Sequence, residues 1–374
     1  MKILVTGGAG FIGTHLVREL LGHGHEVVIL DNLDAQVHGK DAVKRFPAEV
    51  ESIHGDVTDP VAVDRVLEGC DAVAHLAATV GVGQSMYEVT YYTHTNVNGT
   101  ACLYERIIKN KSPIKKVVVA SSMSAYGEGM YACSQCAKPV RGKPRASENL
   151  KKEAWELFCP ACRGVLEPRP IPESEPFSCE SVYALTKRDT EELALLLGRA
   201  HKIPTTALRF FNVYGPGQAL SNPYTGVLAI FFSRVINGNP PVVYEDGLQS
   251  RDFVYVGDVA RALRLALEKD VHGEVFNVGT GRALTVKEIA YMAIKAAGKQ
   301  ARIEPAVVRG FRPGDVRHCF ADVTKIKREF GWEPTMTLEE GVRMIFEWST
   351  TVVARDRFEQ AASELGSYGL LRPR

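Results

Sequence analysis

The chain lacks a surplus of charge, a long apolar run and any repeated or low-complexity tract. Its 45 basic and 44 acidic residues give a formal net charge of +1, so charge gives no reason to expect nucleic acid or an anionic membrane as the main partner. No apolar run reaches the roughly 18 residues that a membrane-spanning helix needs. The length of 374 residues suits one large or two intimately joined α/β domains.

We expect no cleavable signal peptide at the N-terminus. The segment Met1–Gly7 enters a strand at once, and a cleavable signal would have to include the glycine loop that follows. We therefore expect a cytoplasmic protein. In that reducing compartment the eight cysteines are not expected to form disulfides.

Short apolar runs alternate with segments of helical periodicity along most of the chain. The runs predict strands at 2–6, 27–30, 50–54, 72–76, 116–120 and 205–210, and the periodic segments predict helices at 11–21, 61–67, 93–109, 182–201 and 227–236. Such alternation implies a parallel sheet that is covered on both faces. The pattern breaks between Gly127 and Pro176, a stretch rich in Cys, Pro, Lys and Arg, which we interpret as an inserted module.

The glycine loop Gly7-Gly8-Ala9-Gly10-Phe11-Ile12-Gly13 follows the first strand and opens the first helix. Glycines at this spacing allow a tight turn and a close approach of the backbone to a pyrophosphate at a helix N-terminus. Asp31 ends the next strand, which completes the dinucleotide fingerprint of a Rossmann-type, doubly wound sheet. Its carboxylate would accept both ribose hydroxyls and repel a 2′-phosphate, so NAD is favoured over NADP. The alternative is a purely structural glycine turn.

Tyr183 and Lys187 lie four residues apart in the predicted helix 182–201 and therefore share one face. A nearby ammonium favours phenolate, so we expect Lys187 to lower the pKa of Tyr183 and make it a general base for a sugar hydroxyl. Taken alone, a Tyr-x-x-x-Lys pair is a weak signal, because such pairs arise by chance on amphipathic helices.

Ten segments together resemble the extended short-chain dehydrogenases/reductases of the nucleotide-sugar epimerase/dehydratase group. They follow one another in that family's order across most of residues 1–350: TGGAGFIG, HGDVTD, HLAA, NVNGT, VVVASSMSAYG, YALTK, RFFNVYGP, SRDFVYVGDVA, FNVGTG and RPGDVRHCFAD. The resemblance implies a homodimer that packs two helices per subunit into a four-helix bundle, here the helix before Lys109 and the one carrying Tyr183.

The resemblance also implies roles for individual residues. Tyr183 is the base and acid, Lys187 tunes it, and Ser122 hydrogen-bonds the reacting oxygen of the sugar. The implied NAD contacts are Gly7, Gly10, Phe11, Ile12, Gly13, Asp31, Asn32, Asp56, Val57, Leu76, Ala77, Ala78, Asn96, Tyr183 and Lys187. The implied substrate contacts are Ser122, Asn212, Arg251, Arg312 and Cys319, with the two arginines clamping the diphosphate. The alternatives are a cap at a strand end for Ser122, an ordinary N-cap for Asp56, surface ion pairs for the two arginines, and hydrogen bonds to buried backbone for Asn96 and Asn212.

The family's 4,6-dehydratases carry an Asp-Glu pair after that Ser, whereas this chain has Met123 and Ser124. Neither side chain can act as acid or base at carbon 5 or 6 of a hexose, so we expect an NAD-dependent 4-epimerase that works through a transient 4-keto sugar. Cys319 stands where 4-epimerases gate sugar size, though a plain core cysteine is the alternative. The chain resembles dTDP-L-rhamnose 4-epimerases, which interconvert dTDP-L-rhamnose and dTDP-6-deoxy-L-talose, with UDP-hexose 4-epimerases close behind.

Other interpretations stay open. One is another NAD-linked enzyme of the family, namely a reductase, decarboxylase or dehydratase. The other is an NAD-sensing scaffold with a partner-binding insert, against which the intact Ser122, Tyr183 and Lys187 weigh.

Two Cys-x-x-Cys pairs, Cys133/Cys136 and Cys159/Cys162, flank a 22-residue spacer in the insert. This spacing predicts a four-thiolate structural zinc ribbon, with free thiols as the alternative. A lid over the active site or an oligomer contact is the role we expect for it, and nucleic-acid binding the less favoured one. We expect 1–127 and 177–214, with parts of 251–281, to form the NAD-binding domain, 128–176 the ribbon, and 215–250 with 282–350 the smaller nucleotide-sugar domain. The tail 351–374 receives no function.

Overall fold

A seven-stranded parallel sheet forms the centre of the protein in the computed structural model, which describes residues 1–38 and 50–372. The strands follow the order β14-β9-β5-β4-β1-β2-β3. They are β1 (Lys2–Thr6), β2 (Glu26–Asp31), β3 (Glu51–His54), β4 (Ala72–His75), β5 (Lys116–Ser122), β9 (Thr205–Phe210) and β14 (Glu274–Val278). The central strands are apolar and buried on both faces, as a parallel sheet requires. The order reverses beside β1, so a crevice opens at the carboxyl ends of the strands.

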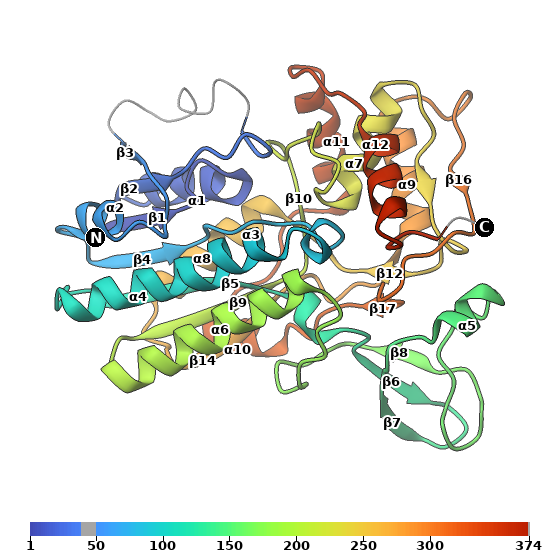
Figure 1. The fold of residues 1–374 in the computed structure, drawn as a ribbon, viewed down its shortest axis with the longest axis horizontal. Helices are drawn as coiled ribbons and strands as arrows, with labels where there is room; N and C mark the ends of the chain where they lie inside the picture. The colour runs from blue at the N-terminus through green and yellow to red at the C-terminus, as the bar shows by residue number, and fades with distance from the viewer. Residues whose placement is uncertain (39–49, 373–374) are drawn as a thin grey trace.

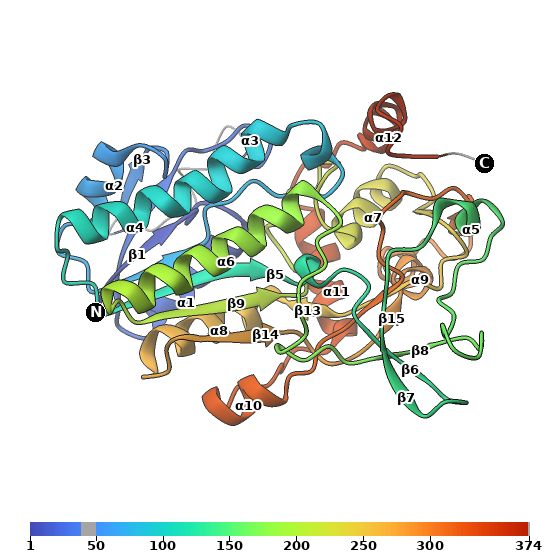
Figure 2. The ribbon, with the colours of Figure 1, turned by 60° about the horizontal axis from the view of Figure 1, so that its bottom comes forward.

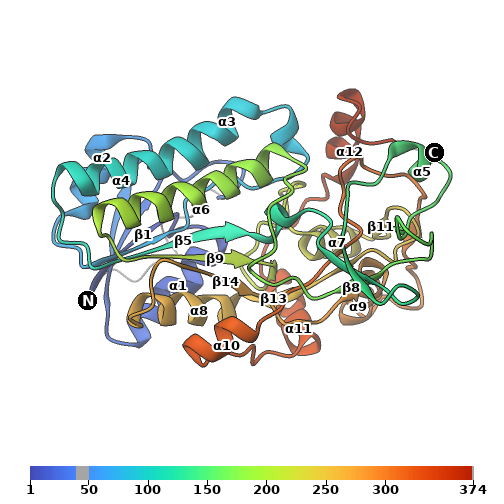
Figure 3. The same ribbon diagram turned by 90° about the horizontal axis from the view of Figure 1, so that it is seen from below.

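Helices cover both faces of this sheet (Figures 2 and 3). One face carries α1 (Phe11–Gly22), α8 (Val256–Glu268) and α10 (Thr324–Phe330), and the other carries α2 (Pro60–Leu67), α4 (Gly99–Lys109) and α6 (Val182–His201). Leu16, Leu20 and Leu263 on the first face are fully buried against the sheet. Each such side chain contributes about 1.5–3 kcal/mol of transfer free energy.

The helix that carries Tyr183 begins and ends where the sequence predicts. Ser181 caps α6 by accepting a hydrogen bond from the Ala184 N–H at 3.1 Å, and Lys202 ends it in the left-handed conformation at φ 55°. The predicted helix 93–109 is less regular. It consists of α3 (Val89–Thr93), a π-helical turn (His94–Asn98) and α4 in succession.

A second group of elements lies beyond the carboxyl ends of the central strands (Figure 1). It contains the helices α7 (Val227–Ile236), α9 (Val286–Ala296) and α11 (Leu338–Ser349), which share one apolar core. Its short strands pair as β10 (Asn212–Tyr214) with β13 (Phe253–Tyr255), β11 (Val242–Val243) with β16 (Ala306–Val307), and β12 (Ser250–Arg251) with both β15 (Leu284–Thr285) and β17 (His318–Cys319).

The irregular stretch after Gly127 has a sheet of its own. β6 (Met130–Cys133) pairs antiparallel with β7 (Lys138–Arg141) and with β8 (Glu167–Arg169), and α5 (Ser147–Lys151) lies in the connection. Figure 1 shows these elements projecting from the lower right of the molecule. Their small core contains Tyr131, Leu157 and Leu166 together with two cysteines. Within the described residues, no helix combines the length and apolarity needed to cross a membrane.

Candidate active site

A cleft of about 620 Å³ opens at the carboxyl ends of the central strands. Its walls come from the glycine loop after β1, the segments after β2 and β4, the end of β5, the start of α6 and the segment 312–316. The lining includes most of the predicted site residues: Gly7, Gly10, Phe11, Ile12, Gly13, Asp31, Asn32, Asp56, Val57, Leu76, Ala77, Ala78, Ser122, Tyr183, Lys187, Asn212, Arg251 and Arg312. The fold therefore brings segments from across the chain to one place.

The glycine loop leaves no room for a side chain. Gly7 has φ +70°, and a Cβ added there would lie 2.8 Å from the Ala77 nitrogen. A Cβ at Gly13 would lie 2.3 Å from the Gly7 carbonyl oxygen. No side chain caps the N-terminus of α1, so its first N–H groups face the cleft, and this arrangement fits a pyrophosphate.

Asp31 is the last residue of β2, Asp56 follows the neighbouring strand β3, and both line the cleft. Asp31 accepts hydrogen bonds from the N–H groups of Ala9 and Leu33, both at 2.9 Å, so the carboxylate is fixed at the end of β2. Burial disfavours the charge of Asp56, but hydrogen bonds from Thr58 and Asn32 outweigh it and lower the pKa of Asp56. Both side chains are thus fixed where ribose and adenine edges would lie.

The catalytic candidates meet at the end of β5 and the start of α6. The Ser122 Oγ accepts hydrogen bonds from the Ser124 N–H at 3.2 Å and from the Ser124 hydroxyl at 2.9 Å. Ser122 is also hydrogen-bonded to the phenol of Tyr183. One hydroxyl therefore joins the Tyr183 phenol to the end of the sheet.

The prediction that Lys187 lowers the pKa of Tyr183 is wrong for the protein without a ligand. Burial raises the pKa of Tyr183, and the opposing influence is the hydrogen bond to Ser122. The ammonium of Lys187 is itself buried, and burial lowers the pKa of Lys187 to about 8, partly offset by Glu191. Glu191 in turn accepts hydrogen bonds from Nη2 and Nε of Arg209, at 2.6 and 2.9 Å.

Two predicted residues are not among the described residues that line the cleft. Asn96 lies in the π-helical turn, where it accepts the Thr79 N–H at 2.8 Å and donates to the Thr186 hydroxyl at 2.9 Å. It therefore supports a wall residue, Thr79, and ties it to α6. The Cys319 thiol lies behind Met123 at an S–S separation of 3.4 Å, and burial raises its pKa to about 12.

The substrate end of the cleft carries two arginines and an unsatisfied polar atom. Arg251 donates to Asp315 Oδ1 at 3.2 Å and Arg312 donates to Asp315 Oδ2 at 2.8 Å. Asn212 Oδ1 is buried and has no hydrogen-bond partner among the described residues. A buried polar atom without a partner costs about 1–3 kcal/mol, so its presence in a cleft fits a polar ligand.

Comparison with known proteins agrees with this geometry. Residues 3–147 match the family profile described as NAD dependent epimerase/dehydratase family, and residues 162–345 match the one described as GDP-mannose 4,6 dehydratase. The dTDP-L-rhamnose 4-epimerase of Burkholderia thailandensis is 35% identical over 357 residues, which cover 93% of this chain and 94% of that protein. The chain belongs to the NAD-dependent epimerase/dehydratase family.

Solved structures extend the similarity to the fold. The UDP-glucose 4-epimerase of Thermotoga maritima, solved with UDP-glucose, is 34% identical with a TM-score of 0.75, covering 94% of this chain and 99% of that one. The UDP-glucose 4-epimerase of Thermus thermophilus, solved with NAD, is 31% identical with a TM-score of 0.74, covering 94% and 100%. In this family the glycine loop and Asp31 fit NAD, and Lys187 and Tyr183 would hold its nicotinamide end.

The sequence analysis missed two parts of this site. One is Asp315, three residues after Arg312, which pairs with both arginines; an acidic residue at that short spacing was the available signal. The other is the C-terminal segment, whose helix α12 (Phe358–Ser367) packs at the mouth of the cleft. Leu365 and Leu370 line the cleft, and Tyr224 donates to Glu364 at 2.5 Å.

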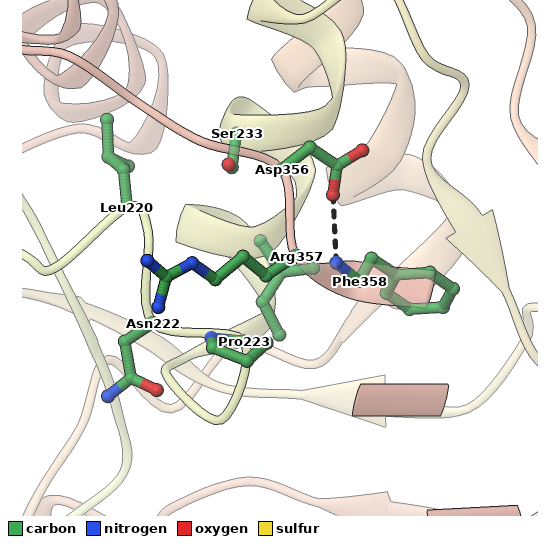
Figure 4. Close-up of a pocket in the computed structure, with 8 residues that line it drawn as sticks. Leu220, Asn222, Pro223, Ser233, Asp356, Arg357 and Phe358 are labelled. Carbon is green, nitrogen blue, oxygen red and sulfur yellow. Dashed lines mark hydrogen bonds between the residues drawn. The ribbon is translucent and has the colours of Figure 1, made fainter. Parts of the chain in front are cut away.

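The C-terminal segment enters this position across α7. Figure 4 shows Asp356 accepting the Phe358 N–H, at 3.0 Å, beside Ser233 of α7. The cavity between the segment and α7 holds about 10 Å³, at the lower limit of what one water molecule needs. Farther along, the Tyr368 ring stacks on Tyr87 with centroids 4.4 Å apart. The segment thus joins the second group of elements to the loop after β4.

The four cysteines of the insert converge as the sequence predicts. Their Sγ atoms all lie within 4.8 Å of one another, with Cys133 and Cys162 at 3.4 Å and Cys136 and Cys159 at 3.9 Å. Backbone N–H groups of Cys162 and Ala161 lower the pKa of Cys159, which favours a thiolate. Four sulfurs bound to one zinc at about 2.3 Å would lie about 3.8 Å apart, so the donor set fits this metal.

The buried ammonium predicts that Lys187→Met stabilises the fold. Its folded pKa of about 8 lies below its ordinary value of 10.5, so the unfolded chain binds more protons between these values and wild-type stability rises with pH there. At pH 7 the variant avoids burying the charge, and its free energy of unfolding should exceed that of wild type by on the order of 2–3 kcal/mol. Glu191 keeps Arg209 as its partner in the variant.

Thermal melts of the two proteins from pH 7 to pH 10 measure this difference. The gap should narrow as the pH rises, because wild-type Lys187 loses its proton. Lys109→Met is the control, since that ammonium is 61% exposed and its replacement should change the melting temperature little. A lower melting temperature for Lys187→Met at pH 7 would contradict the prediction.

Proposed function

We propose that the protein is an NAD-dependent 4-epimerase of a nucleoside-diphosphate sugar. The observation that carries this proposal is the meeting of Ser122, Tyr183 and Lys187 in a cleft that also contains a dinucleotide glycine loop and two arginines. The positions after Ser122 are Met123 and Ser124, which provide no acid–base pair for the loss of water. Epimerisation needs one base, one bound NAD and room for the sugar to turn.

The chain's own groups supply binding and proton transfer. Tyr183 takes the proton of the sugar 4-hydroxyl, and Ser122 donates a hydrogen bond to the same oxygen. NAD, held by the glycine loop and Asp31, would supply a hydride acceptor and donor for carbon 4 and a positive charge that favours the phenolate. Arg251 and Arg312 hold the diphosphate while the 4-keto sugar turns. Tyr183 then returns the proton.

We propose dTDP-L-rhamnose and dTDP-6-deoxy-L-talose as the substrate pair, with UDP-hexoses as the second choice. The similarity to the Burkholderia enzyme over most of both chains supports the first. Cys319 would influence sugar size through Met123, which lines the cleft, rather than by direct contact. A 4,6-dehydratase is the second candidate activity, because the second half of the chain matches a dehydratase profile.

Incubation with a panel of dTDP-, UDP-, GDP- and CDP-sugars tests the proposal, with products identified by NMR and mass. An epimer of unchanged mass is expected, without an added reductant. Loss of water would indicate the dehydratase, and the absence of any product would favour an NAD-sensing scaffold.

Tyr183→Phe should reduce kcat by several orders of magnitude, because it removes the proton-transferring hydroxyl and leaves the ring in place. NAD should still bind, as measured by fluorescence titration. Tyr291→Phe is the matched control, since Tyr291 is 45% exposed on α9. Turnover of Tyr183→Phe near that of the control would refute the role of Tyr183.

We propose that the insert binds one structural zinc ion through Cys133, Cys136, Cys159 and Cys162. Four protein sulfurs fill a tetrahedral shell and leave no position for substrate or water, so the metal would fold the insert rather than catalyse. The small size of the insert's own core supports this interpretation.

Atomic emission on freshly purified, reduced protein should give close to one zinc per chain. Cys133→Ser should lose the metal and lower the melting temperature, whereas Cys102→Ser on α4, outside the cluster, should keep it. A zinc content near zero in the reduced wild-type protein would remove the zinc proposal.

We further propose a cytoplasmic homodimer that packs α4 and α6 against their counterparts. These helices lie side by side on one face of the sheet (Figure 2), and Leu196 of α6 is 52% exposed there. Sedimentation velocity should show a particle of twice the 41.0 kDa chain mass. Leu196→Glu should shift it toward the monomer, and a monomeric wild type would contradict the proposal.

The division of the chain into domains at residues 127, 176, 214 and 250 also remains a proposal.

A further inference from the structure

The consecutive residues 315–317 lie between the cysteine insert and the two cleft arginines, Arg251 and Arg312, and contact both. Asp315 pairs with Arg251 and Arg312 through its carboxylate. The next two residues, Val316 and Arg317, accept hydrogen bonds from Arg251 through their backbone carbonyls, at 2.5 and 3.2 Å. The position of Arg251 therefore depends on where the backbone of 315–317 lies.

The insert holds that backbone from the other side. Arg145 donates to the carbonyl oxygen of Asp315 at 2.7 Å, and Glu128 accepts the backbone N–H of Arg317 at 2.9 Å. Segment 315–317 is thus bonded on one side to an arginine of the cleft and on the other side to residues of the insert.

Every donor of Arg145 is used. Its Nε donates to Glu128 at 3.1 Å, its Nη1 donates to the Trp155 carbonyl at 3.2 Å and to Glu245 at 2.9 Å, and its Nη2 donates to Glu245 at 2.9 Å and to Asp315. A guanidinium has five N–H groups in a fixed planar fork, so this side chain has a single orientation. The Arg145 side chain is 4% exposed.

A second set of contacts joins the same two parts. Arg317, fully buried, pairs with Glu156 of the insert and with Glu245 and Asp246. His318 lies between Glu156, at 3.2 Å, and the hydroxyl of Ser250, at 2.8 Å. Ser250 directly precedes Arg251 on β12, and His318 lies on the paired strand β17. The insert therefore contacts both strands next to Arg251.

A network of buried charges would be an inefficient means of stabilising the contact between the insert and the rest of the protein. Taking charges out of water costs several kcal/mol per ion, and apolar residues of similar volume would often stabilise an interface as well or better. What a saturated network of charges provides is a fixed geometry. The two cleft arginines need that geometry, since bidentate recognition of a phosphate depends on the angle of each guanidinium.

We propose that Arg145 of the insert is a positioning residue for the substrate diphosphate, acting through Asp315 on Arg251 and Arg312. The inference rests on the proposed function, because it takes the ligand of these arginines to be a nucleoside diphosphate. It also gives the cysteine insert a task in substrate binding without any direct contact between its cysteines and the cleft.

Arg145→Lys tests the proposal without leaving a buried carboxylate unpaired. Lysine keeps a positive charge beside Glu128 and Glu245, but its single ammonium cannot also hold the Asp315 carbonyl in the same plane. We expect the Kd values for dTDP and UDP, measured by calorimetry on the NAD-loaded enzyme, to rise about tenfold, equivalent to about 1.4 kcal/mol. KM for the sugar nucleotide should rise in parallel, while kcat and the Kd for NAD stay unchanged. The melting temperature should fall modestly, because the Trp155 and Asp315 carbonyls lose hydrogen bonds to the guanidinium.

The control is Arg169→Met, which removes an insert arginine that is 52% exposed and paired with Glu167; all its parameters should match wild type. Arg145→Met should weaken dTDP and UDP further, and if it fails to fold, Arg145→Lys decides. Unchanged dTDP and UDP affinity in Arg145→Lys would overturn the inference and leave the proposed function intact. A parallel loss of NAD affinity and of kcat would reduce Arg145 to a general structural role, which also overturns the inference. A wild-type enzyme that binds neither nucleotide would remove both proposals.

Discussion

The site depends on burying one ammonium group beside the end of a parallel sheet. Lys187 gives up hydration to lie in the cleft wall, and burial lowers its pKa to about 8. The phenol of Tyr183, one helical turn before Lys187 on α6, is also buried, and burial raises its pKa. Burial therefore disfavours the charged form of both groups before any ligand enters: the phenol of Tyr183 keeps its proton more tightly, and the ammonium of Lys187 gives up its proton more easily. Titratable groups that are perturbed in this way inside a cleft are typical of acid–base sites.

A second constraint acts at the far end of the cleft. Asp315 and the two carbonyls after it fix the head of Arg251, and Arg312 donates to the same carboxylate. That backbone is fixed in turn by a module inserted between Ser122 and Tyr183. An insertion at this point in the chain can reach the substrate end since it leaves the sheet at the carboxyl end of β5, where the cleft opens.

Much of the central fold could be predicted from periodicity. The helix Val182–His201 and the helix Val227–Ile236 have the predicted bounds, because capping by Ser181 and a regular apolar spacing are local signals. The helix predicted from Thr93 differs, since a π-helical turn places Asn96 against Thr79 and Thr186. That irregularity comes from contacts across the fold, which a local pattern does not contain. The same reason explains why Asp315 and the C-terminal helix were missed.

The sequence by itself determined the glycine turn, the acidic end of β2, the Tyr-x-x-x-Lys pair and the paired cysteines, because each chemistry requires particular residues at a fixed short spacing. Tertiary structure alone decided what surrounds them. It placed Cys319 behind Met123, raised the pKa of Tyr183 where the local pair predicts a lower one, and brought Arg145 to Asp315 across 170 positions of the chain. Burial and long-range hydrogen bonds depend on which segments meet, and only the folded chain brings those segments together.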